Sequence, residues 1–180
     1  MKKIGMIAVF AVLATTIAFS ATLSVQGNVA RVLTVSLGAI GTETGSVALD
    51  VNNLGTQVEA LNAANLIVVS SHKMWTISFA STNKGFLKAG TSSTDLRYDV
   101  KVDTTSLGIT SGNSLSAYTQ LTDSATKTII ATTEGKTQTT GKVLPISILI
   151  PSYAHYLDTL GLSATTAYTD TITITVTANN

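Results

Sequence analysis

The chain has 180 residues, of which 44% are hydrophobic and only 12% are charged, and its formal net charge at pH 7 is +1. This composition excludes a charge-rich disordered chain and leaves too little positive charge for binding to the phosphates of nucleic acid. The sequence contains no cysteine, which excludes a disulfide framework and a thiolate zinc site.

Residues 1–20 have the features of a secretory signal peptide. Two lysines near the start are followed by an apolar run over residues 4–19. Ala18 and Ser20 are small side chains at the positions that signal peptidase reads before its cut, so cleavage is expected after Ser20. The run is shorter than the ~20 residues that span a bilayer. The sequence therefore predicts one exported domain over residues 21–180, with no transmembrane segment in the mature chain.

The first predicted strand of the mature chain spans fifteen residues, 23–37. Leu23, Val25 and Val29 occupy alternate positions together with Gly27, and the positions between them are mostly polar. A period of two places these side chains on one face of a strand. That apolar face has to be covered, either in the protein's own sandwich or in the groove of a neighbouring molecule.

Shorter strands separated by polar turns are predicted through the middle of the chain. The predicted strands cover residues 47–51, 66–70, 74–80, 96–102, 115–121, 128–131 and 143–150. The predicted turns contain glycine and lie at residues 83–85, 111–113, 134–135 and 140–141. Helix is expected only as short turns, at residues 57–65 and 152–162.

The last predicted strand lies near the end of the chain. Tyr168, Asp170, Ile172, Ile174 and Val176 share one face of it, and threonine occupies the positions between them. Residues 21–180 contain 29 Thr and 17 Ser in total, and threonine favours pleated strands because it is β-branched. Composition and periodicity together predict an all-β, antiparallel, two-layer sandwich.

The core of this sandwich is expected to contain the inward aliphatic side chains together with Trp75, Phe79 and Tyr98. Trp75 shares a strand face with Ile77 and Phe79, so we assign it to the core and not to sugar stacking. A small eight-stranded outer-membrane barrel is the architectural alternative. Such barrels carry two girdles of aromatic residues, whereas aromatic residues make up only 6% of this chain.

The two histidines lack the partners that catalysis needs. His72 lies beside Lys73 in a predicted turn, where water would surround both side chains. His155 lies near Asp158, but no nucleophile motif accompanies it. We therefore expect no catalytic residues and no enzymatic activity.

Three aspartates recur every four residues, at Asp95, Asp99 and Asp103. On a strand they would face water beside Arg97 and Lys101, whereas a calcium site needs several oxygen ligands that converge on a loop. We therefore expect no metal site and no bound cofactor.

The two ends of the mature chain, residues 21–29 and 168–176, resemble those of fimbrial subunits of the archaic chaperone-usher type, the spore coat protein U group. In that family an immunoglobulin-like sandwich lacks one strand, and the gap is filled first by a chaperone and then by the N-terminal segment of the next subunit. This chain departs from the family pattern because it lacks cysteine and ends on two asparagines.

The resemblance implies an immunoglobulin-like fold and self-association with other copies or related subunits, with a periplasmic chaperone and an usher as further partners. It also implies passage through the periplasm to the cell surface or to an extracellular fibre. The residues implied to form the donated strand are Leu23, Val25, Gly27 and Val29.

The sequence thus predicts a secreted structural or adhesive subunit of a pilus-like or fimbria-like surface fibre that assembles by exchange of its N-terminal strand. The alternative is a monomeric extracellular binding module for carbohydrate or another surface ligand. In that alternative, the N-terminal strand folds into the protein's own sheet.

Overall fold

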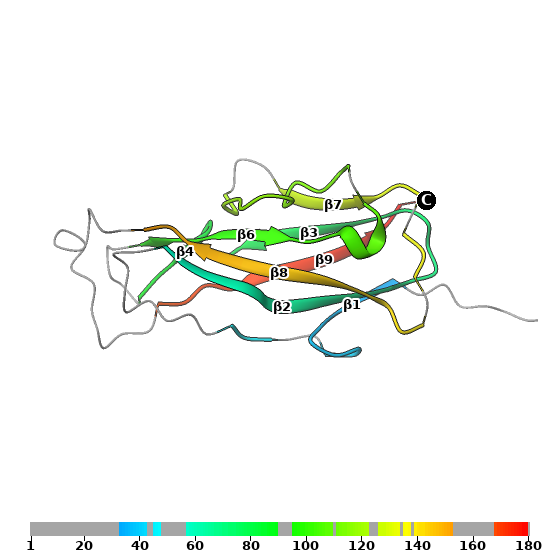
Figure 1. Ribbon diagram of the computed structural model, residues 1–180, viewed down its shortest axis with the longest axis horizontal. Coiled ribbons are helices and arrows are strands. Elements are labelled where there is room, and N and C mark those ends of the chain that lie inside the picture. The colour runs from blue at the N-terminus through cyan, green and yellow to red at the C-terminus, as the bar shows by residue number, and fades with distance from the viewer. Residues whose placement is uncertain are drawn as a thin grey trace, which may run out of the picture.

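The computed structural model shows an antiparallel all-β sandwich (Figure 1). The residues that it describes are 33–42, 45–47, 57–89, 95–109, 111–122, 126–133, 135–137, 139–152 and 168–179. The strands in this part of the chain are β1 (Leu33–Leu37), β2 (Val58–Ser70), β3 (Trp75–Ser81), β4 (Phe86–Leu87), β5 (Leu96–Arg97), β6 (Asp99–Val102), β7 (Lys127–Ala131), β8 (Lys142–Ile150) and β9 (Ile172–Ala178). One 3₁₀ turn, η1 (Thr105–Leu107), follows β6.

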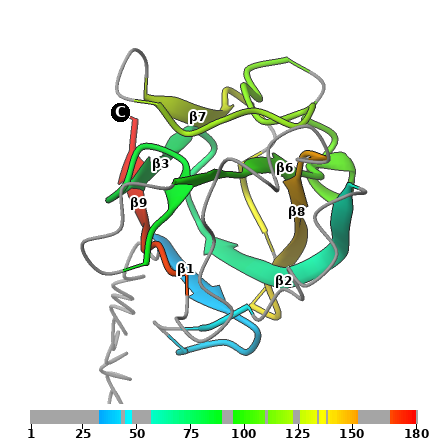
Figure 2. The same ribbon diagram turned by 90° about the vertical axis from the view of Figure 1, so that its left-hand side faces the viewer.

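Two main sheets make up the layers of the sandwich. The first has the strand order β1-β2-β8-β6, and the second has the order β7-β3-β9. All of their strand pairs are antiparallel, and β4 and β5 form a separate two-stranded ribbon. Viewed from one end, the two sheets face each other across the core (Figure 2). The predicted fold class is therefore confirmed as an antiparallel β-sandwich.

The core lies between the sheets and consists of side chains at alternate strand positions. Trp75, Ile77, Phe79 and Tyr98 are all buried, as predicted. The indole Nε1 of Trp75 donates a hydrogen bond of 2.8 Å to the carbonyl of Gly135, so its one polar atom has a partner inside the core. The aliphatic side chains buried around them include Leu66, Val68, Leu96, Val100, Leu115, Ile129, Leu144 and Ile150.

The prediction of a helical turn at residues 57–65 is wrong, because β2 covers most of that segment. The register between β2 and β8 shifts between Ala60 and Ala64, which marks a β-bulge. Within the bulge, Asn62 has a φ of 51° and its backbone N–H donates to the Ser147 hydroxyl at 3.1 Å. A bulge adds an unpaired residue to one strand and therefore interrupts the two-residue period.

Other predicted boundaries also differ from the structure. Residues 115–121 form no continuous strand, although Asn113 and Thr119 make isolated bridges to β7 and β6. The last strand begins only at Ile172. Before it, Thr169 forms an isolated bridge to Lys88. Of the predicted first strand, only residues 33–37 lie among the described residues, where they form β1.

Two further predicted elements lie mostly outside the described residues. For the predicted strand 47–51, only Val47 is described, and it lies outside any strand. For the predicted helical turn 152–162, only Ser152 is described. The predicted turn at 83–85 is confirmed, since Lys84 and Gly85 have φ values of 63° and 80° there.

Candidate functional site

The two lateral sides of the sandwich differ, and one of them is closed. On this side β6 and β7 are the edge strands of the two sheets, and residues 113–119 lie between them. Val100 and Thr119 exchange two backbone hydrogen bonds of 2.9 and 3.0 Å, and Ser114 N–H donates to the Thr128 carbonyl at 2.9 Å. These bonds give part of the outer backbone of both edges a partner.

The opposite side is bounded by β1 and β9, the other two edge strands. Figure 2 shows β1 and β9 next to each other there, and Figure 1 shows that they run in opposite directions. Their Cα atoms come within 8 Å, but no ladder pairs the two strands in the described part of the chain. We call the space between them the β1–β9 gap.

The apolar side chains of β1 and β9 pack against the core but are only partly buried. The partly buried residues on these two strands are Leu33, Val35, Leu37, Ile172, Ile174 and Val176. Their neighbours on the central strands, such as Val68 and Ile77, are completely buried. The gap therefore exposes apolar surface beside two strand edges whose outer backbone groups have no ladder partner among the described residues.

A cavity of about 520 Å³ opens from the β1–β9 gap into the core. Its walls combine apolar side chains from both sheets with a polar group at one end, formed by Tyr98 and Asp170. The apolar lining includes Leu37, Phe79, Leu87, Ile148, Ile172 and Ile174. Most of the lining is thus suited to apolar side chains.

The Asp170 carboxylate accepts four hydrogen bonds. Its Oδ2 accepts from the hydroxyls of Ser81 and Tyr98, at 2.5 and 2.6 Å. Its Oδ1 accepts from the backbone N–H groups of Asn83 and Thr171, at 3.0 and 2.7 Å. This carboxylate therefore fixes the segment just before β9 to the end of β3 and to Tyr98.

Burial, followed in importance by the hydrogen bond to Asp170, raises the pKa of the Tyr98 phenol well above its usual range. The folded state thus favours the neutral phenol, and this contribution to stability is complete below the unfolded pKa of about 10. It is lost as the pH rises above that value towards the folded pKa.

We therefore expect alkaline pH to destabilise the parent protein more than a Tyr98→Phe variant. The parent should lose up to about 1.4 kcal/mol more of its free energy of unfolding between pH 8 and pH 11, because its unfolded state alone releases the proton. Urea denaturation at both pH values measures the difference. Equal losses in the two proteins would show that Tyr98 does not titrate differently on folding.

The predicted site residues are divided between described and undescribed parts of the chain. Leu23, Val25, Gly27 and Val29 lie outside the described residues, as do His155 and Asp158. In the predicted terminal strand, Tyr168, Asp170, Ile172 and Ile174 line the cavity, and Val176 is a partly buried residue of the edge strand β9 that packs against the core. All five residues therefore contribute to the same side of the molecule.

The prediction that Asp99 faces water is wrong. Asp99 is only 6% exposed, and Arg97 donates two hydrogen bonds to its carboxylate at 2.9 and 3.0 Å. Asp95 pairs with Lys88 at 3.4 Å, and Asp103 accepts from Thr105. Each carboxylate has a different partner, so they do not form one cluster.

His72 takes part in a turn through its backbone. Its N–H donates to the Ser70 hydroxyl at 3.0 Å, and its carbonyl accepts from the same hydroxyl at 3.1 Å. Among the described residues there is no group of three or more His, Asp or Glu side chains placed to hold a metal ion. No helix in the same residues has the length and apolar character needed to cross a membrane.

No protein-family model matches the sequence, and no curated protein matches it. The functional interpretation therefore depends on the geometry of the β1–β9 gap. From the sequence, Phe79 is assigned to the core and Ile148 to a strand, whereas Leu87 is assigned to no element. No local pattern marks any of these three residues as lining a cavity at the side of a sandwich.

Proposed function

We propose that the protein is a secreted structural or adhesive subunit of a surface fibre, and that its β1–β9 gap accepts an apolar strand from another copy. The observation that carries this proposal is the asymmetry of the sandwich. One side is closed by residues 113–119, and the other combines two edges without ladder partners in the described chain with an apolar cavity of about 520 Å³.

The N-terminal segment is the occupant that fits this gap. A strand placed between β1 and β9 supplies backbone groups to both edges and side chains to the cavity. Leu23, Val25 and Val29 form the apolar face needed for this contact. Their burial contributes about 4.5 to 9 kcal/mol before the cost of ordering the segment.

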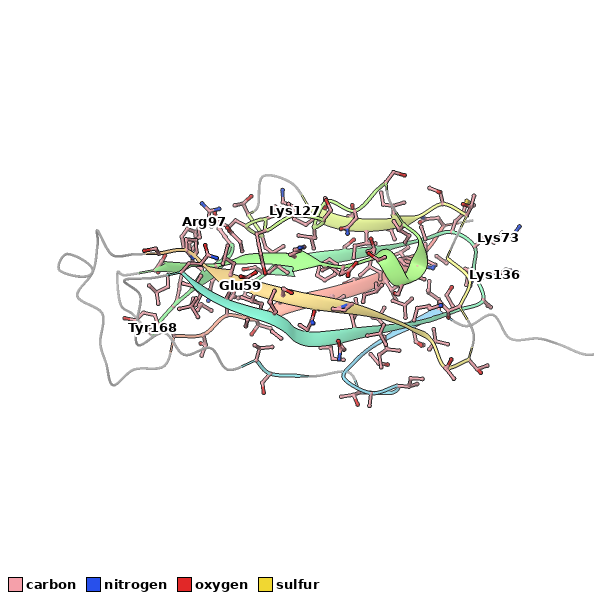
Figure 3. All side chains as sticks on the ribbon, in the orientation of Figure 1. Glu59, Lys73, Arg97, Lys127, Lys136 and Tyr168 are labelled. Carbon is pink, nitrogen blue, oxygen red and sulfur yellow. The ribbon has the colours of Figure 1, made fainter. Side chains whose placement is uncertain are left out.

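The start of β1 and the cavity lie at opposite ends of the described sandwich (Figure 3). Leu33 pairs with Ser70 and Ala178 pairs with Trp75, so β1 begins and β9 ends near the connection that contains Lys73. Figure 3 shows Lys73 at one end of the molecule and Tyr168, at the cavity, towards the opposite end.

The segment that precedes β1 enters the described fold at the Lys73 end. If it inserts into a second copy from the Tyr168 end, every copy can repeat the contact in the same orientation, which produces an open head-to-tail polymer. If it inserts from the Lys73 end, two copies can exchange segments reciprocally and form a closed dimer. The fibre therefore requires insertion antiparallel to β9.

A Val25→Asp substitution tests this function. It places an unpaired carboxylate on the apolar face, and desolvation of that charge costs several kcal/mol. We expect the variant to fold with an unchanged melting temperature but to need at least about 100-fold more protein for filament formation, which corresponds to about 2.7 kcal/mol. Thermal melting and electron microscopy of the same samples provide the two measurements.

A Ser24→Asp variant is the matched control, because it adds the same charge on the opposite face of the segment. It should assemble like the parent. A different result would support the monomeric binding module, in which the strand folds into the protein's own sheet. In that case the parent never forms filaments, and the Val25→Asp variant melts at a lower temperature than the parent. Assembly of Val25→Asp at the parent's concentration would exclude burial of this face.

A further inference from the structure

Part of the β1–β9 gap is too narrow for an inserted strand. A strand inserted between two others needs them about 9.6 Å apart, which is twice the usual spacing of about 4.8 Å. The Cα atoms of β1 and β9 approach within 8 Å. At that point the two strands must separate by at least about 1.6 Å before an inserted strand can pair with both of them.

The gap is not uniform. Leu37, at the end of β1, lines the cavity together with Ile172 and Ile174 at the start of β9. Val35 and Val176 lie on the same two strands nearer the Lys73 end, and they do not line the cavity. The cavity is thus confined to the end of the gap where β1 finishes.

The β9 side of the gap is held firmly. β9 pairs with β3 over seven residues, from Ile172 to Ala178. Asp170 just before it accepts the four hydrogen bonds described above, and Asn179 just after it donates from its backbone to the Met74 carbonyl at 3.1 Å. Both ends of β9 are therefore fixed to the second sheet.

The β1 side is held less firmly. β1 pairs with β2 over five residues and has no other ladder partner in the described chain. It continues into a turn that contains Gly38 and Gly41, with φ values of 78° and 87°, and the position of a Cβ on either glycine has no atom within 4 Å. Within this segment Leu37 N–H donates to the Thr42 carbonyl at 2.8 Å and Gly41 N–H to the Ser36 hydroxyl at 2.9 Å, and Gly38 N–H donates to the Asn65 carbonyl of β2 at 2.8 Å. The links of β1 that these bonds and the ladder provide therefore lead only to β2, and the turn is the fixed point about which β1 can swing.

We propose that β1 is the moving edge of the acceptor site, an inference that rests on the proposed function. In the free subunit β1 lies close to β9 and covers part of the apolar surface of the gap. When a strand from another copy inserts, β1 moves outward at the turn of residues 38–42 while β9 stays in place. The free subunit thereby exposes less apolar surface than an open acceptor would.

Cross-linking of β1 to β9 tests this movement. Val35 pairs with Val68, two residues before Ser70, and Val176 pairs with Ile77, two residues after Trp75. The two valines therefore lie at similar distances from the connection between the sheets. A Val35→Cys/Val176→Cys variant has no competing thiols, because the parent sequence contains no cysteine. A short, reducible bis-thiosulfonate reagent joins the two thiols.

The matched control is Ser78→Cys/Thr175→Cys. These residues are register partners on β3 and β9, so they lie on neighbouring strands that need not separate. We expect the cross-linked Val35/Val176 protein to keep its β-sheet circular dichroism spectrum but to assemble at least about tenfold less than the cross-linked control. Reduction of the cross-link should restore assembly to the level of the control.

Three results would overturn the inference. Equal assembly of both cross-linked proteins would show that β1 need not leave β9, and the proposed function would stand. Failure of the Val35/Val176 pair to cross-link, while the control pair does, would show that the two strands do not approach in the free subunit. Failure of the parent chain to assemble under any of the conditions would overturn both the inference and the proposed function.

Discussion

A Trp75→Ala substitution is expected to remove about 3 to 5 kcal/mol from the free energy of unfolding. Trp75 has 0% exposure, and its neighbours in the core cannot fill the space that an indole leaves. The Gly135 carbonyl also loses its hydrogen bond from the indole. Because a domain is stabilised by only about 5 to 15 kcal/mol in total, this loss is a large share of its stability. Urea denaturation followed by circular dichroism measures the loss.

Two further variants test the assignment of Trp75 to the core, one at its hydrogen-bond partner and one at an exposed neighbour. Gly135→Ala tests the same contact from the other side, since its Cβ would overlap the Lys73 carbonyl and lie 2.5 Å from Trp75 Nε1. It should also be clearly destabilised. Met74→Ala, at a side chain that is 39% exposed, should change stability by less than about 1 kcal/mol. A Trp75→Ala protein as stable as Met74→Ala would contradict the assignment of Trp75 to the core.

The parts of the fold that the sequence predicts well are those with an uninterrupted two-residue period. Trp75, Ile77 and Phe79 alternate with polar residues. The observed strand β3, Trp75–Ser81, lies one residue further along the chain than the predicted strand 74–80. The strand predicted over residues 143–150 corresponds to β8, and the last three apolar residues of the predicted terminal strand lie in β9. In these strands the burial of one face determines both the strand and its register.

The parts that were not predicted depend on tertiary contacts. The first half of β2 contains the bulge at Asn62, whose backbone N–H bonds to Ser147, 85 residues further along the chain. Residues 115–121 are predicted as one strand, but in the structure only isolated bridges join Asn113 to β7 and Thr119 to β6. Asp99 is buried because Arg97 covers its charge. The local pattern does not specify the partner of Asn62 or the contacts of residues 113–119, and although it places Arg97 beside Asp99, it does not specify that Asp99 is buried.

The candidate site was predicted only in part for the same reason. The sequence identifies an apolar terminal strand, and the structure shows that Ile172, Ile174 and Val176 are only partly buried and that the first two line the cavity. The role of Asp170 was not apparent, because Ser81 and Tyr98 lie 89 and 72 residues away from it in the chain. A carboxylate on the inner face of a strand signals a buried polar partner, but the pattern does not say which one.

An Asp170→Asn substitution should lower the free energy of unfolding by about 2 to 4 kcal/mol. The side-chain amide is similar in size to the carboxylate, but its NH₂ group cannot accept a hydrogen bond. This group replaces either the oxygen that accepts from the hydroxyls of Ser81 and Tyr98 or the oxygen that accepts from the backbone N–H groups of Asn83 and Thr171. At least one buried donor then loses its acceptor, and hydrogen bonds to a charged group contribute about 1.5 to 3 kcal/mol each. Chemical denaturation at pH 7 measures the change. Asp95→Asn is the control, since its exposed ion pair with Lys88 should contribute less than about 1 kcal/mol.

A double-mutant cycle with Tyr98→Phe shows whether the carboxylate acts through this network. The Tyr98 hydroxyl donates to Asp170 at 2.6 Å, so removing both groups should cost less than the sum of the single losses, by at least about 0.5 kcal/mol. Additive losses would mean that the two groups stabilise the fold separately.

Because Asp170 fixes the start of β9, its loss should also weaken assembly by the donated strand, whereas Asp95→Asn should leave assembly unchanged. If Asp170→Asn unfolds more easily but still assembles like the parent when folded, the acceptor edge does not depend on this carboxylate.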